Sequence, residues 1–184
     1  MVKLLAIVGS LRKDSLNLQL AQIAQDYLKE NAKVEIYRIN GIPLLNQDIE
    51  YPAPLEVKNL REKVKNADGV WFFTPEYNHF FPGVLKNTID WLSRPVSEEE
   101  GQVLNGKPAA ISGISPAMTG TSHAQDHLVT LLSFLNMDIM NQPRLVIPNG
   151  LEQVNEEGKL ILTSSLPYLQ KEADAFVKFT SDRK

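Results

Sequence analysis

The sequence predicts an α/β fold with a five-stranded parallel sheet of order 2-1-3-4-5 and helices on both faces. Short apolar runs alternate with longer segments that carry apolar residues at helical spacing, which is the pattern of a parallel sheet with crossover helices. The apolar runs are nearly continuous, as expected for strands that are buried on both faces. Right-handed crossovers leave few topologies, and the doubly wound order fits five strands.

The expected strands lie at residues 3–9, 33–39, 68–74, 107–112 and 144–147. The expected helices lie at residues 15–31, 55–66, 82–93, 122–137 and 164–182, and Pro82 suits the first turn of the third helix. Residues 41–54 are rich in proline and turn-forming residues and are expected to form a loop. No repeat, low-complexity tract or linker is found, so residues 1–184 are expected to form a single domain.

Composition narrows the classes of function. A net charge of -3 gives no indication of nucleic-acid binding. The absence of cysteine excludes disulfides, thiolate metal ligands and a cysteine nucleophile. No apolar run approaches the roughly 20 residues of a membrane helix, and Met1 leads directly into an expected strand without a signal peptide. We therefore expect a cytoplasmic protein that binds neither nucleic acid nor membrane.

Two polar loops follow the first and third expected strands. In a doubly wound sheet, ligands bind beyond the carboxyl ends of the strands, at the point between these two strands where the order reverses. The first loop, residues 9–17, reads GSLRKDSLN, and the second, residues 74–79, reads TPEYNH. The predicted topology brings both loops to one crevice, which makes it the candidate site.

The first loop leads into a helix, whose free N–H groups and dipole favour an anion. Ser10, Ser15 and Asn17 add short donors, and Arg12 can pair with phosphate oxygens. Neither G-x-G-x-x-G nor the P-loop motif is present, so the loop suits one phosphomonoester held without a metal ion. The alternative is that Ser15 is only a helix cap and Arg12 a solvated charge.

The second loop places Pro75, Glu76, Tyr77 and Asn78 directly after an aromatic strand. A rigid turn here would present backbone N–H groups to a flat polar heterocycle, with Tyr77 as an apolar wall. The alternative is an exposed turn with Tyr77 in a small satellite core. Together the two loops predict a mononucleotide site that orients a cofactor and leaves the redox chemistry to it.

The segments GSLRKDSLN at 9–17, TPEYNHFFPGVLKNTIDWLSRP at 74–95 and GKPAAISGIS at 106–115 resemble the NADPH-dependent FMN reductase family. This family has a flavodoxin-like three-layer sandwich fold and includes quinone, chromate and azo-dye reductases. The resemblance implies FMN as cofactor and NADPH or NADH as donor, with hydride passing to the flavin N5. It further implies a small-molecule acceptor: a quinone, azo compound, free flavin or metal oxyanion.

Two other functions remain open at this stage. A flavodoxin-like carrier would bind FMN and pass single electrons to protein partners, but it would be expected to show a strongly acidic docking face. A scaffold or regulator without flavin would rest on analogy of fold alone.

The resemblance also implies which residues bind the cofactor. The first loop would surround the FMN phosphate, the second would border the ring largely through backbone groups, and the segment after the fourth strand would lie near the other side of the ring. The expected cofactor-binding residues are Ser10, Arg12, Ser15, Leu16, Asn17, Pro75, Glu76, Tyr77, Asn78, Ser112 and Ser115. No residue is assigned a catalytic role of its own, because these side chains mainly bind and orient.

The resemblance also implies a homodimer or tetramer, with the helix at 82–93 at the subunit contact. The candidate apolar anchors on this helix are Leu85, Ile89, Trp91 and Leu92. Trp91 is equally a candidate core residue.

Three positions depart from the family pattern. Asp14 would repel a phosphate unless its side chain turns away, for example as a helix cap. Phe80, together with Phe81, would narrow the substrate face beside the flavin. His123 lies in the stretch GTSH at 120–123, which replaces a Gly-Gly-x-Arg-like segment. The spacing of the three histidines at 79, 123 and 127 indicates no metal site.

Overall fold

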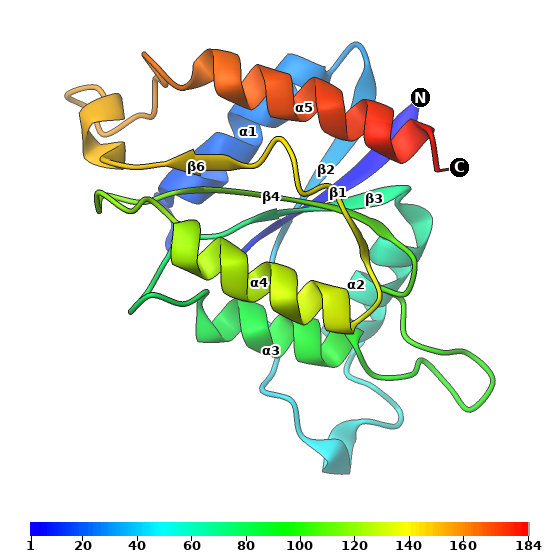
Figure 1. Ribbon diagram of the computed structural model, residues 1–184. Coiled ribbons are helices and arrows are strands. Elements are labelled where there is room, and N and C mark those ends of the chain that lie inside the picture. The colour runs from blue at the N-terminus through cyan, green and yellow to red at the C-terminus, as the bar shows by residue number, and fades with distance from the viewer. Residues whose placement is uncertain (184) are drawn as a thin grey trace.

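The computed structural model describes residues 1–183, in which a parallel sheet lies between two layers of helices (Figure 1). The strand order is β2-β1-β3-β4-β5, with β6 also paired to β4, so the predicted order is confirmed. The strands are β1 Val2–Val8, β2 Ala32–Arg38, β3 Gly69–Phe73, β4 Pro108–Ile114, β5 Asp138–Ile139 and β6 Leu145–Ile147.

The position beyond β4 is shared by two short strands, where the sequence predicted one. β5 pairs with the amino end of β4, at Pro108 and Ala109, and β6 pairs with its carboxyl end. Residues 140–144 leave the sheet between them and include Pro143, which has no N–H to donate to a ladder. This edge is therefore interrupted in the middle.

The helices confirm the predicted alternation of strand and helix. Helices α1 and α5 cover one face of the sheet, and α2, α3 and α4 cover the other (Figure 1). Their bounds are α1 Leu16–Leu28, α2 Leu55–Asn66, α3 Gly83–Leu92, α4 Ser122–Phe134 and α5 Leu166–Ser181, with short 3-10 helices η1 Gln47–Ile49 and η2 Gly150–Gln153. Within residues 1–183, none of these helices has both the length and the apolar character needed to cross a membrane.

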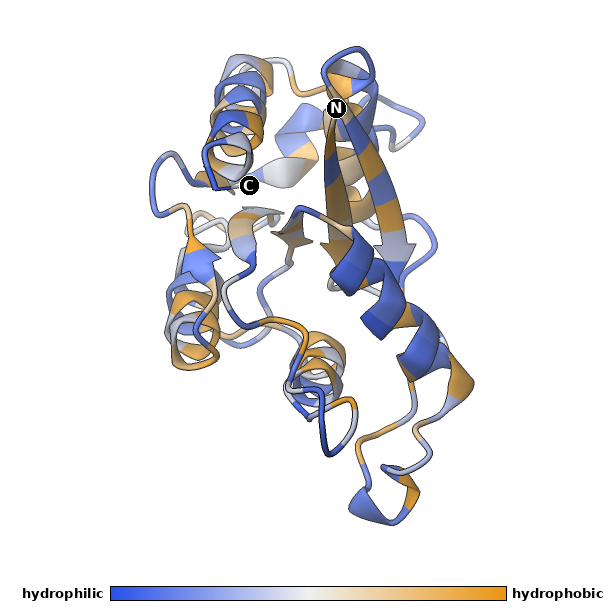
Figure 2. Cartoon of the chain, turned by 90° about the vertical axis from the view of Figure 1, so that its right-hand side faces the viewer, coloured by the Kyte–Doolittle hydropathy of each residue, from blue (hydrophilic) through white to orange (hydrophobic). Residues whose placement is uncertain are grey.

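The core has two layers because both faces of the sheet are buried. In β1, Leu4 and Val8 pack with α1 and α5, whereas Leu5 and Ile7 pack with the helices of the other face. This explains why the strands have no alternation in sequence. The helices, by contrast, carry hydrophobic and hydrophilic residues on different sides (Figure 2), which is typical of a surface helix on an apolar sheet.

Helix α3 belongs to the core of this chain. Leu85, Ile89, Trp91 and Leu92 are fully buried within it, so the prediction that they anchor a partner subunit is wrong. The Trp91 indole N–H donates to the carbonyl of Pro43 at 2.8 Å. This bond holds the loop 41–54 against the helix, and the loop forms the part of the chain that extends furthest below the sheet in Figure 1.

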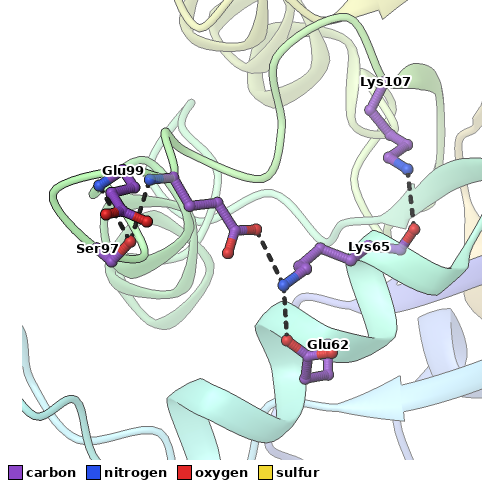
Figure 3. Close-up of polar contacts among 6 residues, drawn as sticks. Glu62, Lys65, Ser97, Glu99 and Lys107 are labelled. Atoms are coloured by element: carbon purple, nitrogen blue, oxygen red, sulfur yellow. Dashed lines mark hydrogen bonds and ion pairs between the residues drawn. The ribbon is translucent and has the colours of Figure 1, made fainter.

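A group of charged side chains fixes the loop before β4 at the amino edge of the sheet (Figure 3). Lys65 Nζ lies 2.9 Å from carboxylate oxygens of both Glu62 and Glu100. The Ser97 hydroxyl accepts the N–H of Glu100 at 3.1 Å, and Lys107 donates to the Lys65 carbonyl at 3.4 Å. Since ligands of such sheets bind at the opposite, carboxyl edge, we assign these contacts to loop anchoring.

Candidate cofactor site

The two polar loops meet at the carboxyl edge of the sheet. The Gly9 N–H after β1 donates to the Phe73 carbonyl at the end of β3, at 2.8 Å. A cavity of about 440 Å³ opens beside this junction, within the range of roughly 300–1,000 Å³ that is usual for small-molecule sites. It is lined by Ser10, Arg12, Asp14, Ser15, Leu16, Asn17, Pro75, Tyr77, Ile114, Pro116, Leu151, Val154, Glu157 and Gly158.

Gly113 allows the elements around the cavity to approach one another closely. A Cβ atom at this position of β4 would lie 2.3 Å from Thr121 Oγ1 and 2.4 Å from the Thr74 carbonyl oxygen. Thr74 directly precedes Pro75, which lines the cavity, and Thr121 is the residue before α4. Glycine is therefore required for this packing, because any side chain would push the two segments apart.

The first loop forms the amino end of α1, as the sequence predicts. Ser15 is the N-cap, with its hydroxyl accepting the Leu18 N–H at 3.4 Å, and it also lines the cavity. Ser10 accepts the Arg12 N–H at 3.3 Å, which tightens the loop. Because the helix end carries unpaired N–H groups and a partial positive charge, this end of the cavity suits an anion. Asp14 lines the same end and is not the cap.

Arg38, which sequence reasoning missed, holds the first loop from outside. Its Nη2 donates to the carbonyls of Leu11 at 3.3 Å and Arg12 at 3.4 Å. Since the C=O and N–H of a trans peptide point in opposite directions, the N–H groups of Arg12 and Lys13 point away from Arg38. The position of Arg38 at the end of β2, next to β1, is the signal that places it here.

Asn17 lines the cavity and also has a structural role. Its side-chain amide donates to the Ile114 carbonyl at 2.9 Å and accepts the Ile114 N–H at 3.1 Å. Both ends of the amide are therefore paired with one residue of β4. Asn17 joins α1 to β4 and shapes the cavity.

The second loop is a tight turn. Tyr77 and Phe80 exchange two backbone hydrogen bonds, of 2.9 and 3.1 Å, and the residues between them, Asn78 and His79, have φ of 52° and 61°. Two successive positive φ values are those of a type I′ turn, which asparagine accepts more readily than histidine. Tyr77 is 54% exposed and lines the cavity, so it is not part of a satellite core.

Tyr77 also lines a second cavity of about 440 Å³ on its other side. The walls of this cavity are mostly apolar and come from the first loop, the segment after β2 and the start of α3. Its lining residues are Leu11, Ile39, Gly41, Ile42, Leu44, Tyr77, Pro82, Gly83, Val84 and Asn87.

Glu76 and Asn78 do not line the first cavity. The Glu76 carboxylate accepts the Ala124 N–H at 3.0 Å and lies 3.3 Å from His123 Nδ1, so it faces the start of α4. Within residues 1–183, the backbone N–H groups of Glu76 and Asn78 have no acceptor, whereas that of Tyr77 is bonded within the turn. Both of these N–H groups therefore keep a free donor at the end of β3.

Ser112 and Ser115 lie off the cavity, which corrects the expectation that they border it. The Ser112 hydroxyl accepts the Trp71 indole N–H at 2.8 Å and donates to Glu172 of α5, inside the core. The Ser115 hydroxyl accepts the Ala117 N–H at 3.2 Å. Ser115 points to the opposite side from Ile114 and Pro116, which line the cavity, whereas Ser112 shares their side but lies further from the carboxyl end of β4, under α5.

Glu172 is the one buried carboxyl whose pKa rises strongly among the described residues. Burial raises its pKa to about 8, although the hydrogen bonds from Ser112 and the Leu145 N–H, and the charge of Arg144, act in the opposite direction. At neutral pH the carboxyl is therefore largely protonated. It stabilises the sheet–helix contact behind the cavity and does not reach the cavity itself.

The far wall of the cavity is formed by a segment between β6 and α5 to which the sequence analysis assigns no function. Leu151, Val154, Glu157 and Gly158 form this wall, and Gln19 of α1 fixes it by accepting the Leu160 N–H at 2.8 Å. The available signal was topological: the segment follows β6, whose carboxyl end lies at the same edge of the sheet as those of β1 and β3.

Phe80 and Phe81 do not narrow either cavity, contrary to the expectation. The Phe80 ring packs on Phe81 and on His127, with centroid separations of 4.4 and 4.5 Å. Phe81 is buried in the core. Both rings are thus used in packing the turn against α4.

The arrangement of groups fits a mononucleotide. Hydroxyls, Arg12 and the start of α1 can hold a phosphate at one end, and Tyr77 and Pro75 offer a flat apolar wall at the other. Among the described residues that line the cavity, none is a buried nucleophile beside a base. The chemistry that this site offers is therefore binding and orientation.

Comparisons with known proteins agree with this geometry. The profile of the family described as NADPH-dependent FMN reductase matches residues 2–152. A 2-hydroxy-1,4-benzoquinone reductase of Burkholderia sp is 36% identical over 183 residues, covering 100% of this chain and 98% of that protein. An NAD(P)H-dependent FMN reductase of Pseudomonas aeruginosa is 38% identical over 175 residues, covering 95% of this chain and 92% of that protein.

Among solved structures, a flavoenzyme NAD(P)H:(acceptor) oxidoreductase of Paracoccus denitrificans superposes with a TM-score of 0.88 at 33% identity, covering 100% of this chain and 99% of that one. The family profile, the sequence relatives and the superposed fold indicate the same family. The chain belongs to the NADPH-dependent FMN reductase family, oxidoreductases with FMN as cofactor and NAD(P)H as electron donor.

Proposed function

We propose that the first cavity holds FMN, with the phosphate at the amino end of α1 and the ring against the Tyr77 turn. The observation that carries this proposal is the convergence of an anion site and a flat wall on one cavity of about 440 Å³. When bound, FMN supplies the capacity to accept hydride from NAD(P)H and pass two electrons on. The chain supplies its position.

The roles of the side chains follow from their contacts. Ser10 and Ser15 donate hydroxyl hydrogen bonds to the phosphate, and the Arg12 guanidinium pairs with its oxygens. Asn17 and Arg38 are positioning residues, since the first ties α1 to β4 and the second holds the carbonyls of the phosphate loop.

Glu76 ties the ring loop to α4 through the Ala124 N–H, and is likewise a positioning residue. Its own backbone N–H and that of Asn78 are left for the polar edge of the ring. Leu16, Ile114 and Leu151 exclude water from the middle of the cavity.

We propose that the preferred acceptor is a quinone, a flat and uncharged molecule, over a metal oxyanion such as chromate. The second cavity, which Tyr77 shares, has mostly apolar walls. Such walls would not compensate the charge of a metal oxyanion, which loses its hydration on entering an apolar cavity. The names of the relatives from Burkholderia and Pseudomonas putida, the latter a quinone reductase 36% identical over 174 residues, support the same acceptor class. Azo compounds and free flavin are secondary candidates.

The test is steady-state oxidation of NADPH by the FMN-loaded protein with benzoquinone or chromate as acceptor. We expect kcat/KM for the quinone to exceed that for chromate by at least about tenfold, because a charged acceptor loses its hydration in an apolar cavity. Equal efficiency with both acceptors would contradict the acceptor preference.

The outcome that separates the enzyme from a single-electron carrier is different. If the FMN-loaded protein consumes no NADPH with any acceptor, the reductase function itself is wrong, whatever the acceptor preference.

We further propose that the chain is a single FMN-binding domain that works in the cytoplasm as a homodimer or tetramer. The family resemblance supports the assembly, and the apolar surface that would mediate it is considered in the Discussion.

A further inference from the structure

Three side chains outside the FMN cavity converge at the start of α4. Glu76 follows β3, His79 lies in the type I′ turn, and His123 is in the first turn of α4. One ligand atom from each lies within 4.8 Å of the other two. The spacing of the histidines in sequence indicated no metal site, because the convergence arises only when β3 and α4 pack together.

The separations are close to those of a metal centre. Two ligand atoms bound to tetrahedral zinc, each at about 2.0–2.1 Å, lie about 3.3–3.4 Å apart. Glu76 Oε1 and His123 Nδ1 are already 3.3 Å apart. The ring nitrogen of the exposed His79 lies no more than 4.8 Å from the ligand atoms of Glu76 and His123. It needs to approach them by at most about 1.4 Å to reach the separations of a zinc site.

The surroundings of Glu76 favour a cation. Its side chain is only 7% exposed, and the carboxylate is oriented by the Ala124 N–H at 3.0 Å and by the Thr119 hydroxyl at 3.5 Å. A second group that fixes a ligating carboxylate is a common feature of metal sites and strengthens binding. A bound ion would supply full counter-charge to this nearly buried carboxylate.

The donor set selects the kind of ion. Two imidazoles and one carboxylate suit zinc and its neighbours, whereas magnesium and calcium prefer oxygen ligands. The two imidazole rings lie with centroids 4.5 Å apart, so both nitrogens reach the same space beside Glu76. The positive end of α4 opposes the ion, which argues for moderate affinity.

We propose that Glu76, His79 and His123 bind a zinc-type divalent cation, with water in the fourth position. The ion would fix the turn 77–80 to α4 from the side opposite the FMN cavity. This site is independent of the proposed reductase function, since none of its three side chains lines that cavity.

The test is calorimetric titration of the full-length, FMN-loaded protein with zinc chloride, with magnesium chloride as the comparison ion. We expect one zinc per chain and no heat of binding for magnesium. The variants H79N and H123Q should each weaken zinc binding by at least about tenfold, the loss associated with a metal-site residue. Asparagine is chosen at position 79 because it tolerates the left-handed φ of 61°.

H127Q is the matched control. His127 lies one turn further along α4 and packs on Phe80, outside the cluster, so this variant should bind zinc like the parent. Retained FMN absorbance in every variant shows that the fold and the cofactor site persist. Zinc binding unchanged in H79N or in H123Q, or no stoichiometric binding by the parent, would overturn the proposal; the cluster would then be an ion pair with a packed imidazole.

Discussion

At the residue scale, Arg12 is the side chain on which the phosphate end of the site depends most. Its backbone is fixed by Ser10 on one side and by Arg38 on the other, while the guanidinium is exposed at the cavity wall. The backbone of the loop is therefore arranged before a ligand arrives, which reduces the entropy lost on binding.

We expect the variant R12A to retain FMN less tightly by about 1.5–3 kcal/mol, the usual contribution of a hydrogen bond to a charged group. This corresponds to roughly a 10- to 150-fold rise in Kd. Quenching of flavin fluorescence on titration with the apoprotein measures it. K13A is the control, because Lys13 is adjacent and exposed but does not line the cavity. An unchanged Kd for R12A would remove Arg12 from the site.

The sequence identified the right loops but not every side-chain direction. Ser10, Ser15 and Tyr77 were expected near the ligand and do line the cavity. Glu76 faces α4 instead. There it accepts the N–H of Ala124, a partner 48 positions further along the chain. Ser112 points into the core, where it pairs with Trp71 and with Glu172 of α5. Such directions depend on long-range packing, which a local motif does not contain.

At the scale of elements, Glu172 couples α5 to the sheet. Its carboxyl accepts from the Leu145 N–H of β6 at 3.2 Å and from Ser112 of β4, so three elements meet at one buried group. Because the folded pKa of about 8 lies above the ordinary value of 4.5, the folded chain binds this proton more tightly than the unfolded chain. The contribution to stability is full below about pH 4.5 and is lost as the pH rises towards 8.

The variant E172Q should therefore be less sensitive to pH than the parent. Glutamine has nearly the shape of the protonated carboxyl and does not ionise; its amide oxygen can accept the Leu145 N–H, and its amide nitrogen can donate to the Ser112 hydroxyl. We expect E172Q to gain stability relative to the parent as the pH rises from 6 to 9. Urea denaturation at both pH values measures the difference. A constant difference across this interval would show that Glu172 does not titrate in it.

The boundaries of helices and strands could be predicted where a hydrophobic pattern extends over many residues, and not where it covers only a few. The two-residue strand β5, Asp138–Ile139, is too short to show any pattern. Helix α4 ends at Phe134, three residues earlier than expected, and Asn136 beyond it has a φ of 57°. Asparagine in the left-handed region is a common helix stop, so this end was readable in principle.

At the scale of the whole molecule, the sheet order followed from the sequence because right-handed connections permit few alternatives. The cavity wall at 151–158 did not follow, since an irregular segment has no period to interpret. The apolar surface was likewise visible only in the structure. Leu44, Ile49, Tyr51 and Leu55 are large, exposed and close in sequence, and the first is 81% exposed.

We expect this surface to take part in the proposed self-association, because clustered exposed apolar residues are typical of subunit contacts. The variant L44D should shift the protein towards the monomer in sedimentation velocity at micromolar concentration. F134D is the comparison variant, since Phe134 is equally exposed but lies at the end of α4. A parent protein that sediments as a monomer would refute the assembly; an L44D variant that stays associated would place the contact elsewhere.

Tyr77 separates the first cavity from the second, and this position couples the order in which ligands bind to them. Because a single side chain separates the two cavities, a rotation of Tyr77 towards one cavity enlarges the other. The ligand that binds first in the first cavity therefore sets the size of the second cavity for the ligand that binds next.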